Sequence, residues 1–319
     1  MNPQLTEISK NVLRNCLGLR EQESFLIVTD DTKKELAEAV YEAGKQLGAE
    51  AMMVVMKERL KSGEEPPAAI SVAMANADVV LCITQHSLTH TQARKNAAKA
   101  GARLATMPGI TEDMFLEGAI AADYAQVKQL TYEVTDLLTK AGKVRIEKDG
   151  YVLAFSIEER QGIPSTGVYV NPGESGNLPS GEAYIAPVEG SAEGQIRIDG
   201  SIAGIGKLSA PVLLTLEQGR IVRAESEGQE AQQLLHILGD GDGRLLGEFG
   251  IGTNDKARIT GVVLEDEKVY GTIHVAFGSN NTFGGTISAG VHIDGVVTRP
   301  NVFLDDVLIM EHGKLVEVP

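Results

Sequence analysis

Between residues 5 and 142 the chain alternates between two patterns of hydrophobic and polar positions. In some segments apolar residues recur every three to four positions, which predicts amphipathic helices, and between these lie short continuous apolar runs, which predict buried strands. Strands buried on both faces and separated by helices are typical of a parallel sheet covered by helices. We therefore predict a doubly wound α/β domain over residues 1–143. Its expected strands are SFLIVTDD (24–31), EAMMVVMK (50–57), DVVLCIT (78–84) and ARLATMPG (102–109).

After residue 143 the pattern changes. Short apolar runs separated by glycine-rich turns replace the helical period, and only GQEAQQLLHILG (228–239) keeps a clear helical pattern. Short strands joined by tight turns predict hairpins, and we expect a strand at GVYVN (167–171) and a hairpin over residues 257–278. Residues 144–319 are thus predicted to form a mainly antiparallel β domain, which gives the chain an α+β fold overall.

The balance of charge narrows the kinds of partner. The chain has 29 basic and 44 acidic residues, a net charge of −15, and no basic run offsets it, so we expect no nucleic acid partner. The sequence has no run of about 18 apolar residues, and it has no basic leader followed by an apolar stretch. We therefore expect no membrane association and a cytoplasmic location. Cys16 and Cys82 lie within apolar patterns and are expected in the core.

Five residues of the C-terminal half interrupt apolar or glycine-rich segments with groups that can bind metals. In a strand, residues two apart share a face, so His292 and Asp294 in VHIDGVV project together. His274 lies in TIHVAFG, Glu248 in LLGEFGIGTN and Glu182 in NLPSGEAYIAP. Taken alone, each of these residues is typical of a hydrogen-bonded position in the core. Together they supply the nitrogen and oxygen ligands that suit zinc, manganese, cobalt or iron. We predict that they converge on a metal site.

Other polar residues allow two interpretations. Glu267 in LEDEKVYG is either an exposed hairpin corner or a general base near His274. The stretch TQHSLTHTQAR (84–94) follows the third predicted strand, where the carboxyl ends of parallel strands form clefts. It either faces a ligand or starts a helix, with Thr89 expected to be part of the capped start. The residues of this stretch with candidate binding groups are His86, Thr89, His90 and Arg94, whereas His236 and His312 are expected to be structural.

At these residues the chain resembles the metallo-aminopeptidases of the aminopeptidase T and aminopeptidase S kind. The matching stretches are PSGEAYIAP, GEFGIGTN, DEKVYGTIHVAFG and HIDGVV, with HSLTHTQAR as a weaker match. The resemblance implies an α/β domain followed by a mainly β domain, a homodimer, and two divalent ions such as Zn, Co or Mn. The five residues that it places on metal-ligand positions are Glu182, Glu248, His274, His292 and Asp294.

The resemblance also implies an activity, the release of N-terminal residues from peptides by a metal-activated water. Glu267 is then the candidate that carries a proton to the leaving amine. The family's peptidases use a tyrosine shortly after the first histidine, whereas this chain continues with GSNNTFGG and has Asn281 near the expected place.

Two alternatives stay open beside the peptidase hypothesis. The chain is also similar to non-haem iron dioxygenases that open the ring of 2,5-dihydroxypyridine, in which two histidines and one carboxylate bind a single Fe(II). His274, His292 and Asp294 suit that role, with a small aromatic molecule as the substrate. The other alternative is a catalytically silent binding module with a degraded metal pocket. We favour the peptidase hypothesis because a single iron site leaves Glu182 and Glu248 without a cation.

Overall fold

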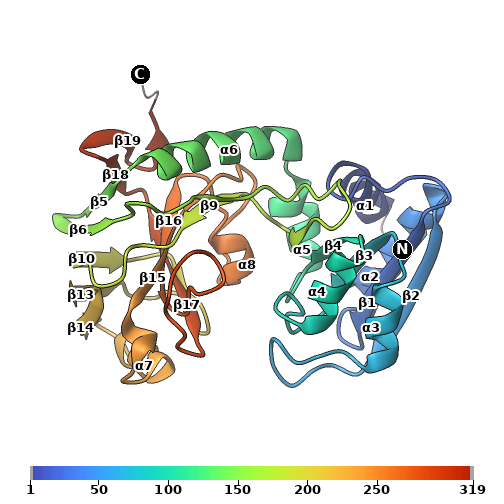
Figure 1. Ribbon diagram of the computed structural model, residues 1–319, viewed down its shortest axis with the longest axis horizontal. Coiled ribbons are helices and arrows are strands. Elements are labelled where there is room, and N and C mark those ends of the chain that lie inside the picture. Colours follow the sequence, from blue (N-terminus) through green and yellow to red (C-terminus); the bar gives the residue numbers. More distant parts are fainter. Residues whose placement is uncertain (1–2, 317–319) are drawn as a thin grey trace. The chain divides into compact units, whose positions relative to one another are not determined.

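The structure, a computed structural model, describes residues 3–316 and divides into two compact units (Figure 1). The N-terminal unit comprises the residues up to Lys128 together with Thr166–Ser180, and the C-terminal unit comprises Gln129–Ser165 and the residues from Gly181 onward. The chain therefore passes between the units three times, after Lys128, Ser165 and Ser180. The change of hydrophobic period predicts a single boundary at residue 143 and contains no sign of the return at 166–180.

The N-terminal unit is built around a five-stranded sheet with strand order β2-β1-β3-β4-β8, in which all pairs are parallel. Its central strand, β3, is apolar and buried at every position, as the alternating pattern predicts for a parallel sheet covered by helices. The elements are α1 (Pro3–Asn15), β1 (Ser24–Asp30), α2 (Lys34–Gln46), β2 (Glu50–Met56), α3 (Ala68–Met74), β3 (Val79–Ile83), α4 (Gln92–Lys99), β4 (Arg103–Thr106), α5 (Glu112–Leu116), the 3-10 helix η1 (Ala119–Ala121) and β8 (Ser175–Asn177).

The C-terminal unit contains two sheets, and all of their strand pairs are antiparallel. The eight-stranded sheet has the order β14-β13-β10-β6-β5-β18-β19-β20 and the seven-stranded sheet the order β12-β11-β17-β16-β15-β9-β7. The first sheet comprises β5 (Lys143–Lys148), β6 (Tyr151–Ser156), β10 (Glu193–Ile198), β13 (Val212–Glu217), β14 (Arg220–Glu225), β18 (Asn301–Leu304), β19 (Val307–Glu311) and β20 (Lys314–Leu315). The second comprises β7 (Ile163–Ser165), β9 (Glu182–Ile185), β11 (Ser201–Ile202), β12 (Gly206–Lys207), β15 (Leu246–Gly252), β16 (Thr272–Gly278) and β17 (His292–Thr298).

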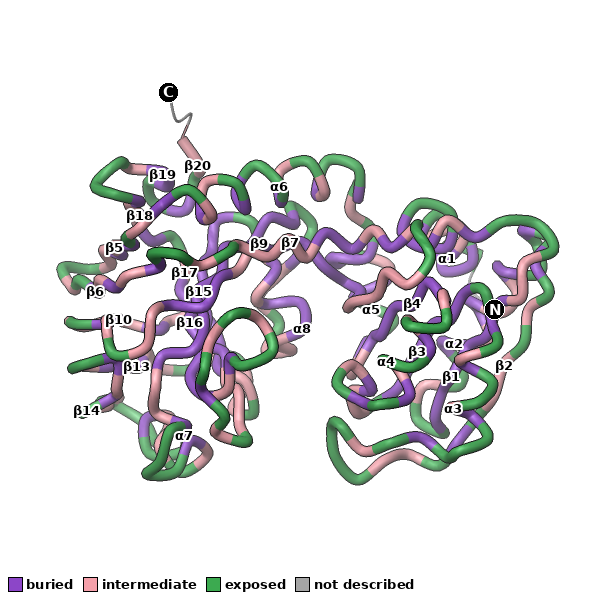
Figure 2. Tube along the Cα trace, in the orientation of Figure 1, coloured by how far each residue is buried: buried purple, intermediate pink, exposed green. Residues whose placement is uncertain are grey.

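One hydrophobic core joins the two sheets of the C-terminal unit. Alternate residues of β15 and β16, among them Phe249 and Val275, belong to the same buried cluster as residues of β5, β6, β10 and β13. The rings of Phe155 in β6 and Phe249 in β15 meet edge to face, with centroids 5.5 Å apart. Figure 2 shows β15 and β16 buried along their length, so both faces of the seven-stranded sheet are covered at these two strands. The helices of this unit are the second part of α6 (Tyr124–Lys140), α7 (Glu230–Leu238), α8 (Val263–Asp266) and the 3-10 helix η2 (Asp242–Arg244).

Two predicted segments differ from the structure. GVYVN (167–171) is not a strand, and the fifth strand of the parallel sheet is instead β8, whose glycine and polar residues give no apolar signal. The expected hairpin over 257–278 contains the short helix α8 before β16. The carboxylate of Asp266 in α8 accepts hydrogen bonds from the backbone N–H groups of Thr260 and Gly261, so a charged run that resembles a turn forms a buried, locally bonded helix.

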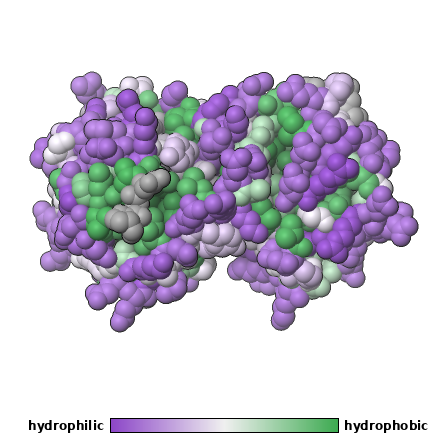
Figure 3. Space-filling view, turned by 90° about the horizontal axis from the view of Figure 1, so that it is seen from above, coloured by the Kyte–Doolittle hydropathy of each residue, from purple (hydrophilic) through white to green (hydrophobic). Residues whose placement is uncertain are grey.

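None of the described helices is both long and apolar enough to cross a lipid bilayer. On the face shown in Figure 3, hydrophilic side chains dominate and hydrophobic residues gather in separate patches. Cys16 and Cys82 are buried, as predicted from their apolar surroundings.

Alanine substitutions of two valines in the C-terminal unit are expected to change the free energy of unfolding by different amounts. Val275 in β16 is 0% exposed and Val222 in β14 is 49% exposed. Removing two buried methyl groups leaves a cavity, so Val275→Ala is expected to lower the free energy of unfolding by about 2 kcal/mol. Val222→Ala, the matched control, is expected to change it by less than about 0.5 kcal/mol. Urea unfolding followed by circular dichroism measures both, and equal losses would contradict the assigned core.

Candidate metal centre

The strand register of the seven-stranded sheet places the predicted metal ligands on one face. His274 in β16 lies opposite Gly250 in β15 and Val296 in β17, and Asp294 lies opposite Ala276. Opposed residues of antiparallel strands share a face, as do residues two apart. The face that carries His274 is therefore the one that faces away from the core. Its members from β9, β15, β16 and β17 include Glu182, Tyr184, Glu248, Gly250, Gly252, His274, Ala276, His292 and Asp294.

A β-bulge at Gly247 brings Glu248 onto this face. Leu246 lies opposite Phe277, a core residue, and Glu248 lies opposite Ala276, so one strand has an extra residue between these pairs. Without the bulge, regular alternation would turn Glu248 toward the core. Bulges are known to re-aim side chains next to active sites. The Asn280 side-chain amide donates to the Gly247 carbonyl at 3.2 Å and helps to hold the bulge.

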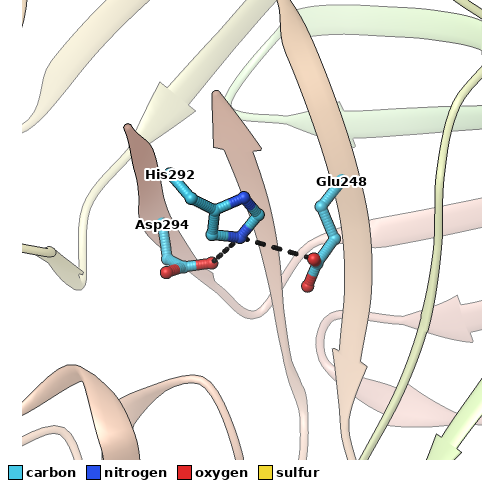
Figure 4. Close-up of side chains that lie close together, drawn as sticks. All are labelled: Glu248, His292 and Asp294. Atoms are coloured by element: carbon cyan, nitrogen blue, oxygen red, sulfur yellow. Dashed lines mark ion pairs between the residues drawn. The ribbon is translucent and has the colours of Figure 1, made fainter. Parts of the chain in front are cut away.

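Glu248 lies between the two imidazoles. Its Oε1 is 3.2 Å from His274 Nε2, and its Oε2 is 3.4 Å from His292 Nε2. Asp294 Oδ1 is 3.5 Å from His292 Nε2, and Figure 4 shows the His292 ring between the two carboxylates. One ligand atom from each of Glu248, His292 and Asp294 lies within 4.8 Å of the others. Glu182 joins the group through its Oε2, which is 3.4 Å from His274 Nε2.

Burial makes the charges of these groups depend on one another. Burial by itself raises the pKa of Glu248, but hydrogen bonds from His274 and His292 outweigh it and hold the pKa at about 2. Burial by itself lowers the pKa of His274, but the hydrogen bond to Glu248 and the charge of Glu182 raise the pKa to about 9. The pKa of His292 is likewise raised well above its ordinary value, against the effect of burial, by Asp294 and Glu248. Positive charge on this face therefore compensates the buried carboxylates.

The residues present fit a divalent cation. Two imidazoles and several carboxylates are the ligands that Zn, Mn, Co and Fe accept, and a cation among them replaces the charge of the two protons. Glu182 Oε2 is buried and accepts no hydrogen bond, so it has an oxygen available for a ligand. The Nδ1 atom of His292 is 2.9 Å from the Ser279 carbonyl oxygen. When Nδ1–H donates to that oxygen, Nε2 is left to bind a metal.

Gly250 makes room for the His274 imidazole. It lies directly opposite His274 in the register, and a Cβ atom at Gly250 would collide with Cε1 and Nε2 of that ring. Only glycine therefore allows the ring to lie across β15 with Nε2 directed at Glu248.

The structure corrects the exposed-corner interpretation of Glu267. Glu267 follows α8, its side chain is 14% exposed, and it forms an ion pair with Lys268. Burial raises the pKa of Glu267 to about 8, and the charges of Glu182 and Asp294 add to this effect while Lys268 opposes it. Its general-base role stays a prediction. Lys268 is a residue that the sequence analysis missed, because it stands in a charged run that resembles a solvated turn, yet it is buried and bonded to Glu182.

The stretch 84–94 lies in the N-terminal unit. Thr91, not Thr89, caps α4, since its hydroxyl accepts from the Arg94 N–H. Thr89 instead hydrogen bonds to Thr106 and Asn177 at the carboxyl ends of β4 and β8. His86 is 3.6 Å from Glu58, and all the metal-site residues belong to the C-terminal unit. His236 lies on α7 and His312 in a turn, and both are exposed.

An aromatic residue stands near the metal face where the peptidase resemblance suggests a tyrosine. Asn281 is exposed, but the ring of Phe283 lies edge-on to His292, with centroids 5.9 Å apart. Phe283 also meets Tyr184 at 5.5 Å. These rings give one side of the site an apolar, aromatic surface without a phenol hydroxyl from this loop.

Comparison with known proteins identifies the family. Residues 4–317 match the family of 2,5-dihydroxypyridine 5,6-dioxygenases, so this chain belongs to that family. Among solved structures it is similar to 2,5-dihydroxypyridine dioxygenase from Pseudomonas putida KT2440, with 20% identity, a TM-score of 0.83, and coverage of 100% of this chain and 98% of that chain. It is also similar to wild-type AmpT from Thermus thermophilus, with 18% identity, a TM-score of 0.70, and coverage of 98% and 99%. No curated protein matches the chain.

These matches correct the predicted activity. The fold is the predicted one, an α/β unit with a parallel sheet and an antiparallel β unit, and it is shared with both solved structures. The family, however, is one of dioxygenases, which are oxidoreductases, so the metallo-aminopeptidase prediction and the hydrolase class that goes with it are wrong. His274, His292 and Asp294 suit both hypotheses, which is why the motifs alone did not separate them.

The position of Gly250 predicts a loss of metal affinity in Gly250→Ala. The added methyl group displaces the His274 ring, so affinity for Mn²⁺ or Fe²⁺ is expected to fall about 10- to 100-fold, as for residues that orient a ligand. Isothermal titration calorimetry measures the affinity. Gly241→Ala is the matched control, because nothing lies within 4 Å of a Cβ there. Unchanged affinity in a folded Gly250→Ala protein would contradict the placement of His274.

His292 is expected to be essential for metal binding and dispensable for folding. His292→Ala removes the nitrogen that faces both Glu248 and Asp294, so the metal content after loading is expected to fall below about one tenth of the wild-type value. Because His292 is partly exposed, the circular dichroism spectrum is expected to stay the same. His236→Ala on α7 serves as the control with full metal content. A His292→Ala protein that keeps its metal would overturn the assignment.

Proposed function

We propose that this protein is a non-haem Fe(II) dioxygenase that opens the ring of a dihydroxypyridine-like aromatic substrate. The observation that two imidazoles and a carboxylate, from His274, His292 and Asp294, share one face of a sheet supports the proposal. Two histidines and one carboxylate form the ligand set of many Fe(II) oxygenases. Membership of the dioxygenase family over residues 4–317 supports iron and oxygen chemistry over hydrolysis.

The chain's own residues would contribute position and charge. Iron, when bound, supplies open positions for an aromatic diol and O₂. His274 and His292 present Nε2 toward the carboxylates, and the Ser279 carbonyl holds the orientation of His292. Glu248, between the two imidazoles, orients both rings and balances the charge of the ion. Burial of this face limits the access of water and strengthens these interactions.

The surroundings of the site suit a flat aromatic molecule. Tyr184 shares the sheet face with His274, and the Phe283 ring contacts both Tyr184 and His292. Aromatic rings attract one another edge to face or offset, and a pair contributes about 0.5–1.5 kcal/mol. A planar ring with polar substituents would thus find an apolar wall beside the cation. The surface offers less to a peptide, whose backbone needs hydrogen-bond partners.

Oxygen labelling tests the proposed reaction. Protein loaded anaerobically with Fe(II) is mixed with 2,5-dihydroxypyridine and ¹⁸O₂, and consumption of one O₂ per substrate with both labelled atoms in the ring-opened product is expected. The balance is substrate plus O₂, with one ring C–C bond and the O–O bond broken and both oxygen atoms bonded to the two carbons that are separated. Zn-loaded protein is expected to be inactive because zinc has no redox chemistry. Iron-loaded protein that consumes no oxygen with any dihydroxypyridine isomer would contradict the proposal and favour a binding module.

A further inference from the structure

Lys268 places a buried ammonium beside the metal face. Its side chain is 1% exposed, and Nζ lies 2.7 Å from Glu182 Oε1. The same ammonium also donates to Glu267 Oε1. The other oxygen of Glu182 is 3.4 Å from His274 Nε2, so the lysine is joined through one carboxylate to an imidazole of the site. Lysine is almost never fully buried without such pairing.

The backbone fixes the position of this ammonium. The Lys268 N–H donates to the Glu265 carbonyl at the end of α8, at 3.0 Å, and the Lys268 carbonyl accepts from the Asn254 N–H at 2.9 Å. Gly252, which lies opposite Glu182 in the sheet, is approached so closely by Val269 that a Cβ there would collide with the Val269 carbonyl oxygen. A glycine at this point of β15 therefore lets the segment carrying Lys268 approach Glu182.

We propose that the Lys268 ammonium takes the place of a second divalent cation and limits this site to one metal ion. The inference deepens the proposed function, because it rests on a single iron. The carboxylates of Glu182, Glu248 and Asp294 would otherwise need more positive charge than one divalent ion supplies. Lys268 supplies part of it permanently, from within the chain.

An ammonium and a metal ion differ in what they can do. An ammonium offers three N–H donors and no coordination position, so it neutralises carboxylates but neither binds a water nor polarises a carbonyl as a Lewis acid. Burial by itself lowers the pKa of Lys268, but the charges of Glu182 and Glu267 outweigh it and keep the pKa above its ordinary value. With a charged lysine in this position, the site cannot carry out hydrolysis that needs two metal ions, but it can carry out chemistry that needs one.

Metal counting tests the inference. Metal-free protein is incubated with excess Mn²⁺, desalted and analysed by inductively coupled plasma mass spectrometry. Wild-type protein is expected to hold one ion per chain and Lys268→Met two, because Glu182 and Glu267 lose their ammonium and become free to bind a cation. Lys268→Arg, which keeps the charge, is expected to hold one. Lys268→Met combined with Glu182→Gln, which removes the charge on both sides, is also expected to hold one.

The outcomes separate the inference from the proposed function. One ion in folded Lys268→Met, or two in wild-type protein, would overturn the inference. If Lys268→Met unfolds without metal, recovery of its circular dichroism spectrum in Mn²⁺ with two ions per chain supports the inference. If Lys268→Met stays unfolded in Mn²⁺ while the variant that also carries Glu182→Gln is folded, the inference is overturned, because a divalent ion then does not replace the ammonium. Oxygen uptake by wild-type protein tests the proposed function independently, because the metal count does not depend on activity.

Discussion

The compensation of buried negative charge is the constraint on which the rest of this structure depends. Three carboxylates, Glu182, Glu248 and Asp294, are buried on one face of a β-sheet, where little water reaches them, and Glu267 lies beside them. Isolated charges in such a place would cost several kcal/mol each. Lys268 and two imidazoles supply the compensating positive charge, and the same carboxylates raise their pKa values. A bound cation would replace the protons on those imidazoles and complete the balance.

Small residues and one irregularity of the sheet make this arrangement possible. The bulge at Gly247 turns Glu248 out of the core, Gly250 leaves space for the His274 ring, and Gly252 lets the segment that carries Lys268 come close. The other face of the same strands is apolar and packs into the core of the C-terminal unit. One face of these strands therefore forms the core and the other carries the metal-site residues, and the glycines lie on the face where ligands must fit.

The hydrophobic period predicted the helices and strands better than it predicted the tertiary contacts between them. Buried strands such as β3 and β16 were recognisable from continuous apolar runs, and His274, His292 and Asp294 share one face because strand alternation is regular in β16 and β17. The bulge at Gly247 and the helix α8 depend on tertiary contacts and hydrogen bonds that no local pattern records. Lys268 was missed for the same reason, because charged neighbours in sequence suggested a solvated turn.

The activity was misjudged because ligand identity alone does not distinguish two related chemistries. The peptidase hypothesis was preferred because a single iron would leave Glu182 without a cation, whereas the structure pairs Glu182 with Lys268. That partner lies 86 positions away in the chain, and only the fold brings it there. Residues that set the number of metal ions can thus lie outside the motif that binds them.

Anomalous diffraction from crystals of the Fe(II)-loaded protein, recorded on both sides of the iron absorption edge, tests the central claim most directly. Our account predicts one iron peak per chain, next to the Nε2 atoms of His274 and His292 and a carboxylate oxygen of Asp294, with the Lys268 ammonium against Glu182. Two iron peaks bridged by Glu182 or Glu248, or a single peak away from both histidines, would contradict it.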